Sequence, residues 1–289
     1  MNRGSLKRRL LRRTPYLSRL ARTLDALEEE NRALQKRLSP MLLTKDAAPP
    51  DAATPSVDAN GLPLPPATLR DWVAGTDDLA WFLEGGQRGV ETLVSVLAKH
   101  HIVLDELDSI LDFGCGCGRV LRHLRRFDRV RIHGTDSNPA AIAWCDQHLD
   151  FAEFGTNRLE PPTRYRQSSF DCIYAFSVFT HLPEALQLPW MRELHRILKP
   201  GGHLIITVHG DHYLPHISVS AQATYQRGEL VVLGEEAVGQ NHCAAFHPER
   251  YVRNILAGDF EVVDFVPQGA LGNPKQDAYL LRATRSTSA

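Results

Sequence analysis

The chain contains the run Ile110-Leu111-Asp112-Phe113-Gly114-Cys115-Gly116-Cys117-Gly118-Arg119-Val120, in which an apolar segment enters a glycine-rich turn and then a helical pattern. Glycines let a backbone approach a ligand closely and adopt a positive φ. A dinucleotide-binding turn has the spacing G-x-G-x-x-G, but Arg119 stands here at the position of the third glycine. The spacing therefore predicts a turn that faces a ligand without phosphates.

A second apolar run ends at Asp136, which lies 18 residues after Gly118. A carboxylate that follows the second strand of such a unit can accept both hydroxyl protons of a ribose. The glycine turn and this acid together therefore predict a site for a ligand that contains ribose.

Short apolar runs alternate with helical periods through this part of the chain, which predicts parallel strands joined by crossover helices. The expected strands are 109–113, 130–134, 151–156, 170–176, 202–208, 260–267 and 277–283. The expected helices are 77–100, 118–126, 138–149, 183–198 and 247–257. The last two strands leave no room for a helix and should form an antiparallel edge hairpin. The predicted fold class is α/β, a Rossmann-like doubly wound sheet of seven mostly parallel strands with an antiparallel last strand.

Two segments precede this domain, which we expect to cover residues 67–289. Residues 39–66 hold seven of the 18 prolines and are typical of a linker. Within residues 1–38, a heptad spacing predicts a coiled coil and a homodimer through residues 6–38. An amphipathic helix packed on its own domain is the alternative. The heptad positions are Leu17, Leu20, Leu24, Leu27, Asn31, Leu34 and Leu38.

The net charge of −1 is unevenly distributed, because the first 24 residues contain eight Lys or Arg and no acid. A solvated helix face explains these charges; nucleic acid, an anionic membrane surface and a transit peptide are alternatives. The longest apolar runs are too short to span a bilayer. Five cysteines without an even framework, and the lack of an apolar secretory segment, favour the cytoplasm.

Four motifs occur in an order that resembles the class I S-adenosylmethionine-dependent methyltransferases. They are the glycine turn at 112–118, Asp136, the run Ser169-Phe170-Asp171-Cys172-Ile173-Tyr174, and Leu198-Lys199-Pro200-Gly201-Gly202. The resemblance covers roughly residues 75–285 and implies S-adenosylmethionine as the cofactor.

The resemblance also implies roles for single residues. Asp112 would hold the ammonium of the cofactor's methionine end, and Asp136 would bind its ribose diol. Asn157 stands where the family often has an acid that meets adenine, which is a departure from the pattern. The expected cofactor-binding residues are Asp112, Gly114, Cys115, Gly116, Asp136, Ser137, Asn157 and Ser177.

Histidines follow two of the strand ends, where open α/β sheets bind their ligands. Methyl transfer requires a nucleophile held about 3–3.5 Å from an activated carbon. It needs no metal, but an oxygen nucleophile gains from a base. His181, His209 and His212 are the candidate bases, while His181 could instead cap the next helix. A metal site near His209 would match no standard ligand spacing, and we expect none.

The connection 210–246 is long, which predicts a substrate cap. Phe179, Tyr213 and His247 are the candidate substrate contacts, although His247 could instead cap the helix that follows it. We expect O-methylation of a small molecule or of a carbohydrate or glycan acceptor. The alternatives are an N-methyltransferase, and an inactive cofactor-binding scaffold that acts through its coiled coil. A nucleic-acid methyltransferase is disfavoured, because no Asn-Pro-Pro-Tyr type of tetrapeptide follows residues 170–176.

Overall fold

The computed structural model describes residues 56–235, 243–272 and 275–284. The predicted coiled coil, its dimer interface at 6–38 and the basic arm lie outside the described residues. None of the helices in the described ranges has both the length and the apolar character that a membrane crossing requires.

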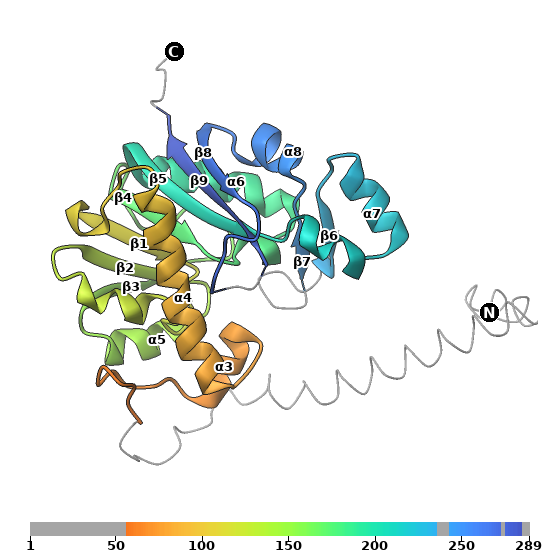
Figure 1. Cartoon of the computed structure of the whole chain (residues 1–289). Coiled ribbons are helices and arrows are strands. Elements are labelled where there is room, and N and C mark those ends of the chain that lie inside the picture. The colour runs from red at the N-terminus through yellow and green to blue at the C-terminus, as the bar shows by residue number, and fades with distance from the viewer. Residues whose placement is uncertain (1–55, 236–242, 273–274, 285–289) are drawn as a thin grey trace, which may run out of the picture. The chain divides into compact units, whose positions relative to one another are not determined.

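A seven-stranded sheet with the order β3-β2-β1-β4-β5-β9-β8 organises the domain (Figure 1). Its first five strands are parallel, and β9 runs antiparallel to both β5 and β8. The strands are β1 (Ser109–Phe113), β2 (Arg131–Asp136), β3 (Ala152–Thr156), β4 (Phe170–Ala175), β5 (Leu198–Val208), β8 (Phe260–Val266) and β9 (Asp277–Ala283). The predicted fold class is confirmed, and the last two strands form the predicted edge hairpin.

Helices cover both faces of the sheet. They are α3 (Ala67–Ala74), α4 (Leu79–Ala98), α5 (Pro139–His148), α6 (Glu184–Ile197), α7 (Val219–Gln226) and α8 (Glu249–Tyr251), and α8 continues as a π-helix over Val252–Leu256. Among the described residues, 3₁₀-helices occupy Leu104–Glu106, Leu121–Arg126, Phe179–His181 and Asp211–His216. Asn138 caps α5, because its side chain accepts hydrogen bonds from Ala140 N and Ala141 N.

The core lies on both sides of the sheet because successive strand residues point to opposite faces. In β1, Ile110 packs in the cluster that includes residues of α4 and α5, whereas Leu111 packs in the cluster that includes residues of α6. Every residue of β1 is buried. Burying each large apolar side chain contributes about 1.5–3 kcal/mol, so the strand that leads into the glycine turn is firmly held.

The turn after β1 is longer than the sequence predicts. We expected a helix over 118–126, but the structure has a 3₁₀-helix that begins only at Leu121. Gly118 keeps a φ of +77°, and a left-handed residue cannot belong to a right-handed helix. The glycine turn therefore extends through Gly118.

Residues 56–66, which the sequence assigns to the linker, pack on the domain. Asp58 and Arg122 form a buried ion pair with 3.0 Å between Oδ2 and Nη2. Arg122 also donates to the carbonyl oxygens of Leu62 and Pro63, and Leu62 is buried in the core. The proline content predicted only a linker. The contact itself could not be predicted, because the partner Arg122 is distant in sequence.

The described part of the predicted cap at 210–246 has its own small core. Strand β6 (Val231–Leu233) pairs with β7 (Ala244–Phe246) to form a separate two-stranded sheet. Its hydrophobic cluster contains Ile217, Ala221, Tyr225, Val231 and Phe246. This unit follows β5 in the chain and lies near the carboxyl end of that strand (Figure 1).

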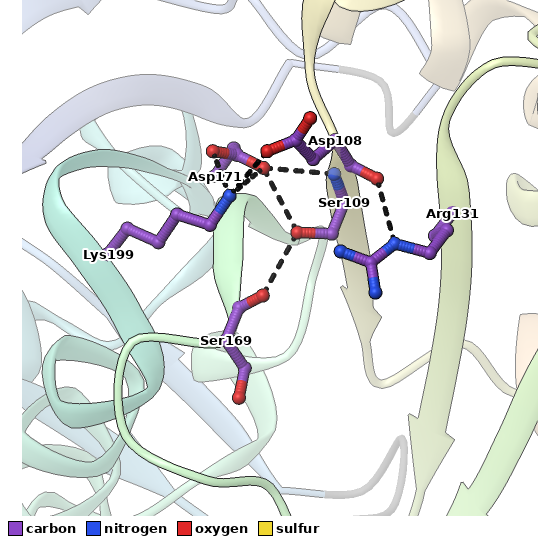
Figure 2. Close-up of polar contacts among 6 residues, drawn as sticks. All are labelled: Asp108, Ser109, Arg131, Ser169, Asp171 and Lys199. Carbon is purple, nitrogen blue, oxygen red and sulfur yellow. Dashed lines mark hydrogen bonds and ion pairs between the residues drawn. The ribbon is translucent and has the colours of Figure 1, made fainter.

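The amino ends of β1, β4 and β5 meet in a polar cluster (Figure 2). Asp171 accepts hydrogen bonds from the backbone N–H and the hydroxyl of Ser109, each at 3.0 Å. Lys199 Nζ lies 2.7 Å from Asp171 Oδ1 and 2.9 Å from Asp108 Oδ2. The acid of the 169–174 motif and the lysine of the 198–202 motif thus join neighbouring strands.

Candidate functional site

A cavity of about 370 Å³ opens at the other edge of the sheet, at the carboxyl ends of β1, β2, β4 and β5. Open α/β sheets bind ligands where the strand order reverses, which here is beside β1. The predicted residues that line this cavity are Asp112, Gly114, Cys115, Gly116, Asp136, Ser137, Asn157, Ser177, His181, His209 and Tyr213. The topology thus brings together segments that are far apart in the chain.

The glycine turn forms a cradle that tolerates no side chain. Gly114 and Gly116 have φ values of +83° and +53°. A Cβ atom at Gly116 would lie 2.4 Å from Val73 Cγ1, and one at Gly114 would lie 2.4 Å from Val178 Cγ2. Glycine is therefore required at both positions by backbone conformation and by space.

Asp136 ties the second strand to this turn. Its Oδ2 accepts a hydrogen bond of 2.8 Å from Gly116 N, and its Oδ1 accepts one of 2.8 Å from Asn138 N. Burial raises the pKa of this carboxyl, while the backbone N–H groups that it accepts from oppose the rise. Each carboxylate oxygen has a second lone pair, so the pair can also accept hydrogen bonds from a diol.

Asp112 is a buried carboxyl in the cavity wall. Asp112 is 4% exposed, and burial raises the pKa of its carboxyl group to about 7. Tyr174 and Arg119 act in the opposite direction but do not outweigh burial. A cationic ligand group beside Asp112 would favour its ionised form, so this end of the cavity suits an ammonium.

Asn157 lies just after β3 and lines the cavity with its side chain already held. Its Oδ1 lies 2.9 Å from Thr135 Oγ1, whose proton is shared with the carbonyl oxygen of Gly155, and its Nδ2 donates to the carbonyl oxygen of Arg158 at 2.7 Å. These bonds place the amide at the end of the cavity that also contains Asp136, with one amide hydrogen left over.

Ser177, just after β4, has a φ of +60°, which costs of order 1–3 kcal/mol for a residue other than glycine. Hydrogen bonds hold it in this conformation. Its backbone N–H donates to Thr207 Oγ1 at 2.8 Å, and its hydroxyl accepts from Gln276 Nε2 at 2.8 Å. Such strain is typical of functional sites, where surrounding contacts over-determine the backbone.

His181 lies at the end of the 3₁₀-helix that follows β4. Its Nδ1 is 2.8 Å from the carbonyl oxygen of Cys243. A carbonyl oxygen only accepts, so Nδ1 carries the proton and the neutral ring has its lone pair on Nε2. This contact therefore sets the tautomer of the neutral His181 ring.

His209 lies just past the end of β5. Its ring packs 4.3 Å from that of Tyr213 and 5.4 Å from that of Phe246, centroid to centroid. Burial, followed by the proximity of His181, lowers the pKa of His209 to about 4. His209 is therefore neutral at physiological pH.

Three predicted residues do not line the cavity. Phe179 is fully buried in the core. His247 is also buried, and its Nε2 donates to Gln187 Oε1 at 3.0 Å. His212 packs edge-on against Tyr213 at a centroid distance of 5.5 Å. The 3₁₀-helices after β4 and β5 direct successive side chains to different sides, which separates Phe179 and His212 from the cavity, whereas His247 follows β7 and is held by Gln187.

Sequence reasoning missed several residues of the cavity wall. They are Trp72, Val73, Trp81, Phe113, Arg119, Val120, Asn138, Arg158, Leu159, Phe176, Val178, Leu182, Trp190 and Gln276. The sequence did single out the position of Arg119, because Arg119 replaces the third glycine of a dinucleotide turn. Its guanidinium lies 5.1 Å from the centre of the Trp81 ring and donates to the carbonyl oxygen of Gly272. Within the described ranges, no group of three or more His, Cys, Asp or Glu residues is arranged to hold a metal ion.

The model of a methyltransferase domain family matches residues 82–262. Two curated relatives are a sterol 24-C-methyltransferase of Gibberella zeae, 31% identical over 109 residues, and a cycloartenol-C-24-methyltransferase of Arabidopsis thaliana, 31% identical over 101 residues. The matches cover 36% and 32% of this chain and, in both cases, 28% of the relative. The chain thus spans well under a third of these relatives.

Solved structures with similar folds include a SAM-dependent methyltransferase from Methanosarcina mazei, with a TM-score of 0.49 and 20% identity. That match covers 65% of this chain and 97% of the other. An S-adenosylmethionine-dependent methyltransferase from Mesorhizobium loti has a TM-score of 0.47 and 16% identity, covering 61% and 90%.

Proposed function

Because the chain belongs to the class I S-adenosylmethionine-dependent methyltransferases, we propose that it methylates an oxygen atom of a hydroxylated small molecule or carbohydrate. S-adenosylmethionine is the cofactor, and when bound it supplies a methyl carbon activated by its sulfonium. The nature of the acceptor and the roles of individual residues belong to the proposal.

The residues of the cavity fit this cofactor. The buried carboxyl of Asp112 suits the ammonium of the methionine end, and Asp136 suits the ribose diol. Gly114 and Gly116 supply the positive-φ turn by which the backbone passes along the cavity wall. Asn157 has an amide hydrogen left for the adenine end.

The observation that carries the oxygen assignment is the tautomer of His181. Its Nδ1 donates to Cys243 O, so Nε2 can take the proton that an acceptor hydroxyl loses as its oxygen becomes a better nucleophile. The low pKa of His209 makes that residue a weak proton acceptor at neutral pH. We therefore assign the base to His181 rather than to His209 or His212.

A carbon acceptor is the second candidate. The names of the curated relatives specify C-methylation of sterols for those proteins. Their matched regions cover 28% of each relative, so most of each relative has no counterpart in the alignment. An N-methyl product and a cofactor-binding scaffold without activity are further outcomes of the experiment below.

The experiment is transfer of a tritiated methyl group from S-adenosylmethionine into metabolite and glycan fractions of the source cell. NMR of the labelled product then distinguishes O-, N- and C-methyl groups. We expect an O-methyl product; a C- or N-methyl product would contradict the proposal, and binding without transfer would favour the scaffold.

A His181→Phe variant tests the base. Turnover should fall by about 10²–10⁴, the usual contribution of a general base, while the affinity for S-adenosylhomocysteine stays unchanged. His216→Phe is the matched control, because His216 is exposed and does not line the cavity. Equal losses of turnover and affinity would indicate a structural role for His181.

The homodimer through residues 6–38 also remains a proposal. Replacing both Leu24 and Leu27 with Asp in the full chain would place charge in the predicted seam. Sedimentation should then show a dimer for the original chain and a monomer for the variant. A monomer in both cases would contradict the coiled coil.

A further inference from the structure

A hydrogen bond between two buried side chains joins the segment around His181 to the segment around β7. Gln187 on α6 and His247, the residue after β7, are both fully buried. Gln187 Nε2 lies 3.3 Å from the carbonyl oxygen of Phe179 and 2.8 Å from that of Leu182. His247 Nε2 lies 3.0 Å from Gln187 Oε1. Neither side chain lines the cavity, so the pair does not contact a ligand there.

These contacts fix the direction of each hydrogen bond in the Gln187–His247 link. A carbonyl oxygen only accepts, so the amide atom near the two carbonyls is the nitrogen, and both of its hydrogens are used. The amide oxygen of Gln187 also only accepts, so the proton of the neutral His247 ring lies on Nε2. Burial lowers the pKa of His247 to about 3, which keeps this ring neutral at physiological pH.

On one side, the link holds the backbone that carries His181. Phe179 begins the 3₁₀-helix that His181 ends, and Leu182 follows that helix directly. The two carbonyl groups that accept from Gln187 thus lie before and after His181 in the chain. The amide of Gln187 therefore restrains the backbone on both sides of the candidate base.

On the other side, the link holds β7. His181 Nδ1 lies 2.8 Å from the carbonyl oxygen of Cys243, which is the residue before β7. His247 follows β7, and its backbone N–H donates to the carbonyl oxygen of His209 at 2.8 Å. The side chains of His181 and His247 therefore connect the same two segments, one at each end of β7. Because β7 has only three residues, fixing its end at His247 restricts where the carbonyl of Cys243 can lie.

We propose that Gln187 and His247 are positioning residues for His181. Their link keeps the carbonyl of Cys243 within hydrogen-bond distance of His181 Nδ1. The hydrogen bond of one ring nitrogen sets the tautomer of a neutral histidine, so this contact leaves the lone pair of His181 on Nε2. The inference rests on the proposed function and deepens it, because it explains how the assigned base obtains the required tautomer.

NMR correlation of the ring nitrogens and ring protons of the histidines tests the proposal, because nitrogen shifts differ between the two tautomers. The full chain is saturated with S-adenosylhomocysteine, and the His181→Phe and His247→Phe variants identify the two rings by their missing signals. In the original chain we expect a proton on Nδ1 of His181 and on Nε2 of His247. The opposite tautomer at either ring would overturn the proposal.

Three variants then test the link itself. Gln187→Met and His247→Phe remove its hydrogen bonds and keep side chains of similar size. In both, His181 should lose its single tautomer, and methyl transfer in the tritium assay should fall about tenfold or more, while the affinity for S-adenosylhomocysteine stays unchanged. His247→Gln keeps a donor for Gln187 and should retain the Nδ1 proton of His181. His216→Phe is the control and should change none of these measurements.

A His181 ring that keeps its Nδ1 proton in Gln187→Met and His247→Phe would overturn the proposal, even if methyl transfer falls. Equal loss of that tautomer in His247→Gln and His247→Phe would also overturn it, because the proposal requires the donor and not the ring. If Gln187→Met and His247→Phe do not fold, the tautomers in the original chain and in His247→Gln still test it. Full methyl transfer by His181→Phe would instead contradict the proposed base, with the link unaffected.

Discussion

The two ends of β1, β4 and β5 hold acidic residues in different ways. At the amino ends, Asp171 accepts from Ser109 and Lys199, and hydrogen bonding and charge from Lys199 lower the pKa of Asp108 (Figure 2). At the carboxyl ends, burial outweighs every compensating contact of Asp112 and raises its pKa to about 7. The acids at the amino ends are therefore compensated within the protein, whereas burial is the dominant influence on Asp112 at the carboxyl ends.

This difference separates stability from binding along the same strands. A carboxylate that has its partners stabilises the fold, and replacing it should leave ligand affinity unchanged. A buried carboxyl whose partners do not outweigh desolvation, such as Asp112, weakens the fold when it ionises, and a cationic ligand group would offset that cost. Substitutions at the amino ends should therefore mainly change the free energy of unfolding, whereas substitutions at the carboxyl ends should change ligand affinity.

The largest effect is expected for Asp136→Ala at the carboxyl ends. Loss of charged hydrogen bonds to a ribose diol should weaken S-adenosylhomocysteine binding by about 1.5–3 kcal/mol. Isothermal titration calorimetry measures this change, with the exposed Asp150→Ala as control. Unchanged affinity would place the ribose acid elsewhere.

The pH dependence of binding is the next largest effect. If the ammonium requires ionised Asp112, a pKa of about 7 predicts that affinity for S-adenosylhomocysteine rises about eightfold from pH 6 to 7.5. Asp112→Asn should bind weakly and show a flat profile. An equal slope in both proteins would contradict this assignment of the ammonium site.

The same pKa has a stability consequence of defined sign. The folded-state pKa lies above the ordinary value of 3.8, so ionisation of Asp112 costs the free chain stability as pH rises from about 4 to 7. Chemical denaturation should show that the unfolding free energy of Asp112→Asn increases relative to that of the original chain as pH rises over this range. A constant difference between the two would show that Asp112 is not buried as described.

A smaller effect is expected for Lys199→Met at the amino ends. The side chain of Lys199 is 32% exposed, so loss of its ion pairs should lower the unfolding free energy by only about 1 kcal/mol. Urea denaturation measures this, with the exposed Lys99→Met as control. Affinity for S-adenosylhomocysteine should not change. A loss of affinity would contradict the separation of stability at the amino ends from binding at the carboxyl ends.

The smallest effect is expected for Asp108→Asn. The Asp108 side chain is 74% exposed and shares Lys199 with Asp171, so solvent screens its contribution. The melting temperature of Asp108→Asn should lie between those of the original chain and Lys199→Met. A larger decrease than that of Lys199→Met would assign Asp108 a role beyond this cluster.

Local patterns predicted the elements that local chemistry controls. Strands 109–113 and 277–283 occur as predicted, and Asn138 caps α5. The predicted cofactor residues also line one cavity, since parallel strands present their carboxyl ends at the same edge. The prediction of a helix over 118–126 was wrong at its start, because composition does not reveal that Gly118 adopts a left-handed conformation.

Long-range contacts could not be predicted in the same way. Gln276 belongs to no motif, and its side chain is held in the cavity wall by Thr207 and Ser177, which are 69 and 99 positions away. The packing of residues 56–66 likewise depends on Arg122. A single chain without an alignment contains no signal for such pairings.

The sequence by itself determined the fold class, the glycine turn and the acid that follows β2, because hydrophobic period and glycine spacing act over a few residues. Only the tertiary structure decided which histidines reach the cavity and which way the Gln187 amide points. A side chain's chemistry is encoded locally, but its hydrogen-bond partners come from strands that meet only when the sheet forms.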